Sequence, residues 1–192
     1  METAGLRGRR AALIPMESGH IDGLYEAAID EEIWRFMSVK IKGRQDMTAV
    51  VESALLQRDA GLEKPFTVMD LESGSIVGST RFLNISNQNK NLEIGWTWYN
   101  PSVWRTRVNT ECKYLLLKHA FEDLGMIRVQ FRTDSRNKRS QAAIARLGAV
   151  SEGVNRHDRI MHDGYIRSSA VFSILKEEWP GVKENLSSIL ES

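Results

Sequence analysis

Apolar and polar residues alternate with a period of two in several short stretches, and this pattern predicts β-strands. Residues 10–16 ("RAALIPM") form the first such stretch, and residues 65–99 hold three β-rich runs. The polar clusters "ESGS" (72–75) and "SNQNKN" (86–91) separate the three runs, and clusters of this length are typical of hairpin turns. Residues 65–99 are therefore expected to form an antiparallel meander.

Apolar residues recur every three or four positions elsewhere, which predicts helices. Two helices are expected before the meander, the first capped by Ser18 and the second capped by Asp46 and ending at Gly61. The first helix carries four apolar residues at helical spacing, namely Ile21, Leu24, Ala27 and Ala28.

A third helix is expected after the meander. It starts near Asn109 or Thr110, and Gly125 stands where a left-handed cap belongs. Its apolar face consists of Leu115, Leu116, Leu117, Ala120, Phe121 and Leu124. Residues 127–133 follow as a strand, because Ile127, Val129 and Phe131 alternate with polar residues.

The remaining pattern predicts a helix, a hairpin and a last helix. Asn137 lies near the start of the short helix and Gly148 at its end. Residues 154–175 read as two long strands joined by the turn "HDG". The amphipathic stretch 177–190 closes the chain, and Pro180 is acceptable in the first turn of a helix there.

Composition and charge limit the classes of function. With 192 residues, 42% hydrophobic and 27% charged, the chain is expected to form one globular domain over residues 1–192. A net charge of +1 provides no general field for nucleic acid or an anionic membrane, so neither is expected as a partner. The first twenty residues lack a long apolar stretch, which predicts a cytoplasmic protein without signal peptide or membrane span.

The only cysteine, Cys112, lies inside the apolar run of the third helix. An internal disulfide is therefore excluded, and the chain fits a reducing compartment. A buried core thiol is favoured over a reactive one.

The start of the third helix is the first candidate for chemistry. The helix itself leaves the backbone N–H groups from Arg105 to Thr110 unpaired, and together with the positive end of the helix dipole they form an anion site suited to phosphates. Arg105 and Arg107 would reinforce the site; the alternative is an ordinary helix start with solvent-facing arginines. Neither a P-loop nor a G-x-G-x-x-G motif occurs, which excludes the common nucleotide-binding motifs.

The run from Leu92 to Gly153, followed by "GYIRSSAVFSILKEEWP" (164–180), resembles the GNAT N-acetyltransferases. The branch it resembles in particular contains RimJ and RimL, the ribosomal-protein N-terminal acetyltransferases. This resemblance implies an α/β (α+β) GNAT fold: a mixed, mostly antiparallel central sheet flanked by helices and splayed between strands four and five to admit CoA.

The resemblance also implies an activity, the direct transfer of an acetyl group from acetyl-CoA to a primary amine. The favoured acceptor is the α-amino group of a protein or peptide. Two alternatives stay open: a small-molecule amine acetyltransferase, and a non-catalytic module that binds CoA or forms a homodimer.

In GNAT enzymes the pyrophosphate of acetyl-CoA lies on a loop with the pattern Q/R-x-x-G-x-G/A. That register falls on "WRTRVN", where Trp104 replaces Gln or Arg, Arg107 replaces the glycine and Asn109 takes the small-residue position. Arginines could hold phosphate oxygens through charge-assisted hydrogen bonds. The resemblance thus implies cofactor contacts from Trp104, Arg105, Thr106, Arg107, Val108, Asn109 and Thr110.

"NKRSQAAIARLGA" is the second matching element. By resemblance, Asn137 contacts the CoA arm, and Ser140 hydrogen-bonds the thioester sulfur and protonates the leaving thiolate. The alternative is structural, with Asn137 as a helix cap and Ser140 as a polar residue of the first turn. Many GNAT enzymes use a tyrosine as the acid four residues before the glycine of this helix, and here that position is Ile144.

The reaction also needs a group that takes a proton from the acceptor ammonium. Glu93 is placed for this by resemblance; the alternative is a solvent-facing strand carboxylate. Backbone amides near Ile94 and Gly95, or a little beyond, would polarise the thioester carbonyl. No metal is expected, because His157 and His162 lack the spacing and companions of a metal site.

Overall fold

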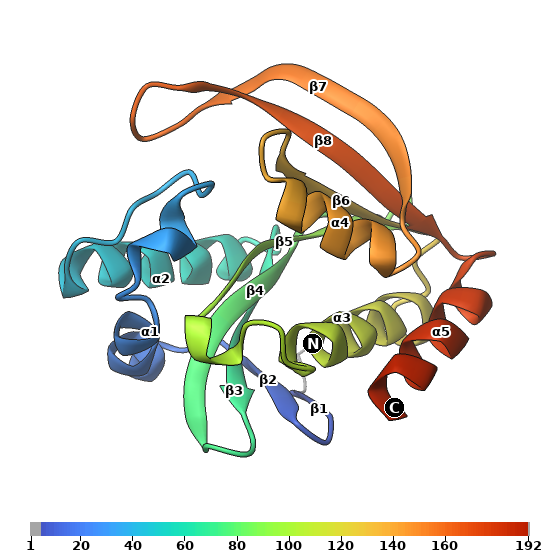
Figure 1. The fold of residues 1–192 in the computed structure, drawn as a ribbon, viewed down its shortest axis with the longest axis horizontal. Helices are drawn as coiled ribbons and strands as arrows, with labels where there is room; N and C mark the ends of the chain where they lie inside the picture. The colour runs from blue at the N-terminus through green and yellow to red at the C-terminus, as the bar shows by residue number, and fades with distance from the viewer. Residues whose placement is uncertain (1–4, 192) are drawn as a thin grey trace.

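The computed structural model describes residues 5–191, which form one eight-stranded sheet in the order β1-β2-β3-β4-β5-β6-β8-β7 (Figure 1). All neighbouring strands are antiparallel except β5 and β6. The strands are β1 Leu6–Arg7, β2 Ala11–Pro15, β3 Lys64–Asp70, β4 Ser75–Ser86, β5 Asn91–Tyr99, β6 Arg128–Asp134, β7 Val150–Ile160 and β8 Ile166–Leu175. The α-helices are α1 Ile21–Ala27, α2 Arg44–Asp59, α3 Val108–Lys118, α4 Lys138–Arg146 and α5 Trp179–Glu191.

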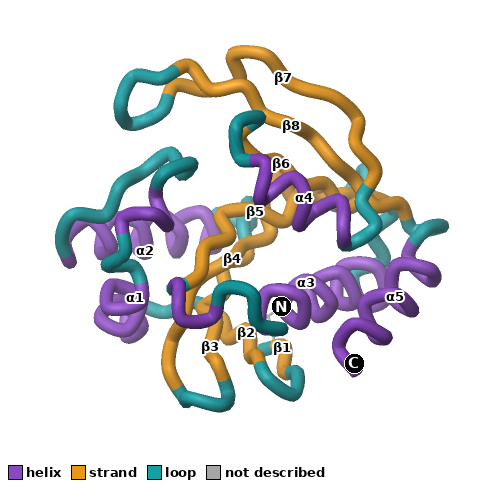
Figure 2. Tube along the Cα trace, viewed as in Figure 1, coloured by secondary structure: helices purple, strands orange, loops and turns teal. Residues whose placement is uncertain are grey.

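The sheet separates two hydrophobic cores. One core packs the sheet against α3, α4 and α5, with Phe82, Leu116 and Phe131 among its buried side chains. The other joins α1 and α2 to the sheet around Trp34 and Trp98, whose ring centroids lie 5.3 Å apart. Figure 2 shows α1 and α2 on one side of the strands and α3 and α5 on the other.

The expected architecture is confirmed, including the antiparallel meander of β3, β4 and β5. Gly125 and Gly148 have positive φ, as the predicted helix ends require. Val129 and Phe131 are buried on β6, whereas Ile127 precedes the strand and is 51% exposed, so its predicted place in the alternation was wrong.

Both predicted N-caps before the meander were wrong. Ser18 begins a short 3₁₀ turn, Ser18–His20, whose N-cap is Glu17, and α1 follows that turn. Helix α2 is capped at Gly43. Asp46 lies three residues further on, where its carboxylate accepts the backbone N–H groups of Lys42 and Gly43 at 2.8 and 3.0 Å.

The prediction differs from the structure in a few further details. Helix α3 starts at Val108, next to the expected start near Asn109 or Thr110, and after Lys118 it continues as a π-helical segment, His119–Asp123. The hairpin strand β7 starts at Val150 rather than residue 154. Strand β1 has no counterpart in the prediction, since two residues are too short for a readable period.

Cys112 is fully buried, as expected of a core thiol, and burial raises the pKa of this thiol to about 12. Across residues 5–191, no helix has both the length and the apolar character needed to cross a membrane.

Candidate active site

The predicted splay between the fourth and fifth strands lies between β5 and β6, because β1 was not among the predicted strands. The two strands pair only over residues 91–93 of β5 and 128–130 of β6, although β5 continues to Tyr99 and β6 to Asp134. A cleft of about 700 Å³ opens where they part. It is lined by β5 and β6, the loop before α3, one face of α4, the loop before α2 and the β7–β8 hairpin.

A β-bulge marks the start of the splay. Ser79 pairs with Trp98 and Arg81 with Gly95, so Trp96 and Thr97 together oppose the single residue Thr80. Trp96 has a φ of +51°, which costs a bulky residue about 1–3 kcal/mol. The bulge interrupts the regular pairing of β4 and β5 beside the cleft, just beyond Gly95.

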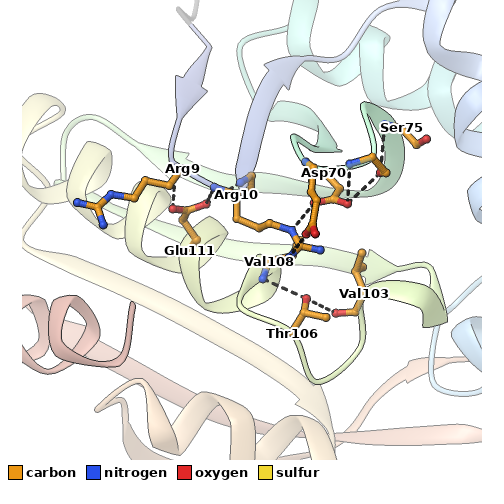
Figure 3. Close-up of polar contacts among 11 residues, drawn as sticks. Arg9, Arg10, Asp70, Ser75, Val103, Thr106, Val108 and Glu111 are labelled. Carbon is orange, nitrogen blue, oxygen red and sulfur yellow. Dashed lines mark hydrogen bonds and ion pairs between the residues drawn. The ribbon is translucent and has the colours of Figure 1, made fainter. Parts of the chain in front are cut away.

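The loop before α3 is held by its own hydrogen bonds (Figure 3). The Thr106 hydroxyl donates to the Val103 carbonyl at 2.7 Å and accepts the Val108 amide at 3.3 Å. The Thr106 amide also donates to the Val103 carbonyl, at 3.3 Å. Within residues 5–191, these bonds leave the amides of Arg107, Asn109 and Thr110 without an intramolecular acceptor.

Glu111 fixes the first turn of α3 against the sheet (Figure 3). Its buried carboxylate accepts the backbone amides of Arg9, Arg10 and Ala11 at 2.6–2.8 Å. A Cβ at Gly8 would lie 2.4 Å from the carboxyl carbon, so any other residue there would displace the carboxylate from this position. This anchor sets the position of the helix start relative to β1 and β2.

The side chains of the helix start divide into two groups. Trp104, Arg105 and Asn109 line the cleft. Arg107 points elsewhere, since its guanidinium donates to the carbonyl of Leu190 in α5 at 3.1 Å. The other predicted cofactor contacts that do not line the cleft are Thr106, Val108 and Thr110.

Helix α4 presents a cationic face that the sequence analysis missed. Arg139 lies over the ring of Trp104 at 4.3 Å, and Arg146 lines the cleft two turns further along α4. Arg139, Ala143 and Arg146 recur at the spacing of one helix face, beside Ser140 and Ile144. That spacing was present in "NKRSQAAIAR" and could have identified the two arginines.

Asn137 and Ser140 both line the cleft at the start of α4. The Asn137 side chain accepts the Ser140 amide at 3.0 Å, so Asn137 caps α4, as the structural alternative stated. The cap bond engages Oδ1 and leaves Nδ2 available to a ligand. The Ser140 hydroxyl makes no intramolecular hydrogen bond among residues 5–191.

Glu93 lies at the pairing end of the splay and is only 5% exposed, which excludes the solvent-facing alternative. Its Oε2 accepts Arg132 at 2.7–2.8 Å and is also within reach of the amides of Asn84 and Gln130. This hydrogen bond with Glu93 raises the pKa of Arg132. Every one of these bonds reaches Oε2, so Oε1 is the oxygen left for the cleft.

Lys113 is a second titratable group in the cleft, and the sequence analysis did not select it. It is 5% exposed, and its Nζ donates to the Thr97 hydroxyl at 2.8 Å, which in turn contacts Thr80 at 2.8 Å. No carboxylate lies within 4.0 Å of this ammonium among residues 5–191. Burial lowers the pKa of Lys113 to about 8.

The cleft as a whole favours anions. Seven cationic side chains and four carboxylates line it within the described chain, although the protein has a net charge of only +1. Groups of three or more His, Cys, Asp or Glu side chains that could hold a metal are absent from the part of the chain that the structure describes.

The splayed sheet, the bulge and the helix start at the cleft define an acyltransferase fold. Residues 10–150 match the family model described as "Acetyltransferase (GNAT) domain", so the chain belongs to the GNAT acetyltransferase family.

Curated relatives agree with this family. YdaF of Bacillus subtilis (strain 168), a protein named for ribosomal N-acetylation, is 31% identical over 113 residues. That match covers 59% of this chain and 61% of YdaF. The "Uncharacterized N-acetyltransferase p20" of Bacillus licheniformis is 25% identical over 94% of this chain and all of that protein.

Solved structures agree as well. A GCN5-related N-acetyltransferase from Brucella melitensis has a TM-score of 0.91 at 26% identity, covering 98% of this chain and 86% of that one. A chain from T. thermophilus, named as an acetyltransferase, has a TM-score of 0.89 at 35% identity, covering 99% of this chain and 98% of that one. RimL, named as the ribosomal L7/L12 alpha-N-protein acetyltransferase, shares the fold with a TM-score of 0.79 at 16% identity.

Proposed function

We propose that the protein transfers the acetyl group of acetyl-CoA directly to a primary amine, in particular the α-amino group of a protein or peptide. The observation that carries this proposal is the splay of β5 from β6 beside the bulge at Trp96 and Thr97. It opens a cleft that is lined from both faces of the sheet, so two substrates can approach one point from opposite sides.

The cofactor is assigned to the side of α3 and α4. Its phosphates would lie against the amides of Arg107, Asn109 and Thr110, with the guanidinium groups of Arg105 and Arg139 as charged partners. Arg107 contributes its amide in this assignment, because its side chain is turned to α5. The pantetheine arm would pass Asn137 and enter the splay.

The acceptor is assigned to the opposite side, beside Glu93. Attack of a neutral amine on the thioester carbonyl forms the amide bond and breaks the carbon–sulfur bond. Glu93, through Oε1 or a water that it holds, takes the proton that the amine loses, and the hydroxyl of Ser140 passes a proton to the thiolate while it regains one from solvent. The bulge amides would hold the developing oxyanion.

A protein acceptor is favoured because YdaF is named for ribosomal N-acetylation. The acceptor side of the cleft is also bounded by two loops, Phe36 and Met37 before α2 and the β7–β8 hairpin, rather than by a closed wall. A small-molecule amine acetyltransferase is the second candidate, because the same splay would serve it.

The test measures free thiol released from acetyl-CoA against a panel of N-terminal peptides and small amines. Each peptide is paired with its N-acetylated form, which cannot accept the group. Turnover of free peptides above both the blocked peptides and the small amines is expected. Turnover of small amines alone would overturn the protein acceptor, and CoA binding without any turnover would favour the non-catalytic alternative.

A further inference from the structure

Arg167 is a buried cation without a bound partner at its tip. It lies on β8, lines the cleft and is 7% exposed. Its Nε donates to the Ser169 hydroxyl at 3.0 Å. Neither terminal nitrogen has a hydrogen bond or an ion pair to any of residues 5–191. Burial is the main cause that lowers the pKa of Arg167.

A second arginine stands directly opposite. Arg159 on β7 pairs with Arg167 in the strand register and lines the same cleft. Its Nε is buried without a hydrogen-bond partner and forms only a long ion pair, 3.5 Å, with the carboxylate of Asp158. Like charges directly opposite each other on neighbouring strands destabilise a sheet.

The nearby carboxylates are already engaged. Asp134 forms a two-pronged pair with Arg136, at 3.0 and 2.8 Å. Asp158 accepts the Ser169 hydroxyl at 2.7 Å and lies 3.7 Å from Arg132. Neither carboxylate lies within 4.0 Å of Arg167, so the terminal guanidinium nitrogens of Arg167 remain available to an external anion.

We propose that Arg159 and Arg167 bind a carboxylate carried by the acceptor. A planar carboxylate matches the fork of a guanidinium group and would relieve the repulsion between the two cations. The inference rests on the proposed acetyl transfer and adds a substrate class to it: amines that carry an acidic group.

The strand register places this carboxylate several bonds from the reacting amine. Arg132, which pairs with Glu93, lies opposite Val171 on β8. Arg167 is four residues further along, about 13 Å at the usual rise of a strand. An acidic side chain at the second or third residue of a peptide spans such a separation better than the α-carboxylate of a free amino acid.

The test compares amidated tetrapeptides that differ only by Glu or Gln at position 2 or 3, so that charge changes and shape does not. A free amino acid and its amide form a third pair, which reports on the α-carboxylate. We expect kcat/KM to be about 10- to 100-fold higher for the Glu peptide than for the Gln peptide, the scale of a charge-assisted hydrogen bond. In Arg167→Gln the ratio should fall below about threefold.

Arg156→Gln is the matched control, because Arg156 is exposed on β7 and does not line the cleft. It should keep the wild-type ratio. Arg167→Lys, which retains the charge but not the fork, should give an intermediate ratio and serves if the Gln variant does not fold. Equal rates for the Glu and Gln peptides together with equal rates for the free amino acid and its amide, or an unchanged ratio in Arg167→Gln, would overturn the proposal.

Binding of the N-acetylated product peptides separates this proposal from the proposed reaction, because it needs no turnover. Tighter binding of the Glu product than of the Gln product, lost in Arg167→Gln, supports the carboxylate site even if no amine is acetylated. Turnover of both peptides with equal product binding leaves the acetyl transfer standing and removes the site. A preference that appears only for the free amino acid over its amide supports the site with the α-carboxylate as its ligand.

Discussion

Replacing Lys113 by Met should stabilise the protein at neutral pH. Burial lowers the pKa of Lys113 from 10.5 to about 8, so the charged form is disfavoured in the folded state. A difference of about 2.5 pKa units corresponds to a penalty of about 3 kcal/mol. Methionine has a similar length and removes the penalty, while the Thr97 hydroxyl keeps Thr80 as a partner.

The pH dependence of this effect has a definite sign. Below pH 8 both states bind the proton on Lys113, so the full penalty is present. Between pH 8 and 10.5 the unfolded state binds more protons than the folded state, and stability therefore rises with pH. Above pH 10.5 Lys113 is neutral in both states and its penalty is absent.

Urea unfolding at pH 6.5, 7.5 and 9.5 provides the measurement. The variant should be more stable than wild type by up to about 1.5 kcal/mol at pH 6.5, after loss of the charged hydrogen bond to Thr97, and the difference should shrink at pH 9.5. A variant less stable than wild type at pH 6.5, or a difference that does not change with pH, would refute the reasoning. If the stabilised variant also loses acetyl transfer, Lys113 is needed by the reaction rather than by the fold.

Three further predictions concern the cofactor and the proton transfers. Replacing Arg105 and Arg139 together by Ala should weaken CoA binding by about 1–3 kcal/mol in calorimetry. The Arg107 side chain is turned away from the cleft, so Arg107→Ala should weaken CoA binding less than the double variant does. An equal loss of CoA affinity in both would contradict the assignment. Ser140→Ala should lower kcat with little change in CoA affinity, and an unaltered kcat would remove Ser140 from the mechanism. Glu93→Gln should lower kcat/KM by about 10² to 10⁴ and recover in part at high pH, where the amine is already neutral; an equal loss at every pH would indicate a structural role.

Hydrophobic periodicity predicted most elements, but it did not predict helix starts. Asp46 was expected to be an N-cap because a carboxylate before an apolar run satisfies orphan amides. A carboxylate three residues after the cap instead reaches back to amides at the helix entry, and Asp46 does so to Lys42 and Gly43. The sequence alone does not distinguish these two arrangements, because both place the same residue types in the same order.

The candidate site was predictable as far as it depended on local order. Glu93, Asn137 and Ser140 line the cleft because strand register and a helix cap fix their directions. The Arg107 side chain does not line the cleft, because it donates a hydrogen bond to a carbonyl 83 residues away in α5. The opposition of Arg159 and Arg167 likewise depends on the register of the hairpin, which an irregularity between Asn155 and Arg159 shifts.

Three residues that line the cleft adopt a conformation or a degree of burial that is unfavourable for their residue type. Trp96 adopts a positive φ, Lys113 buries an ammonium, and Arg167 buries a guanidinium with open tips. Each costs free energy in the folded state, and none is compensated by a partner carboxylate within the described chain. Apolar side chains in place of Lys113 and Arg167 would avoid the cost of the two buried cations. The two buried cations at one cleft fit the proposed ligands, an anionic cofactor on one side and an acidic acceptor on the other, which would supply partners for Lys113 and Arg167.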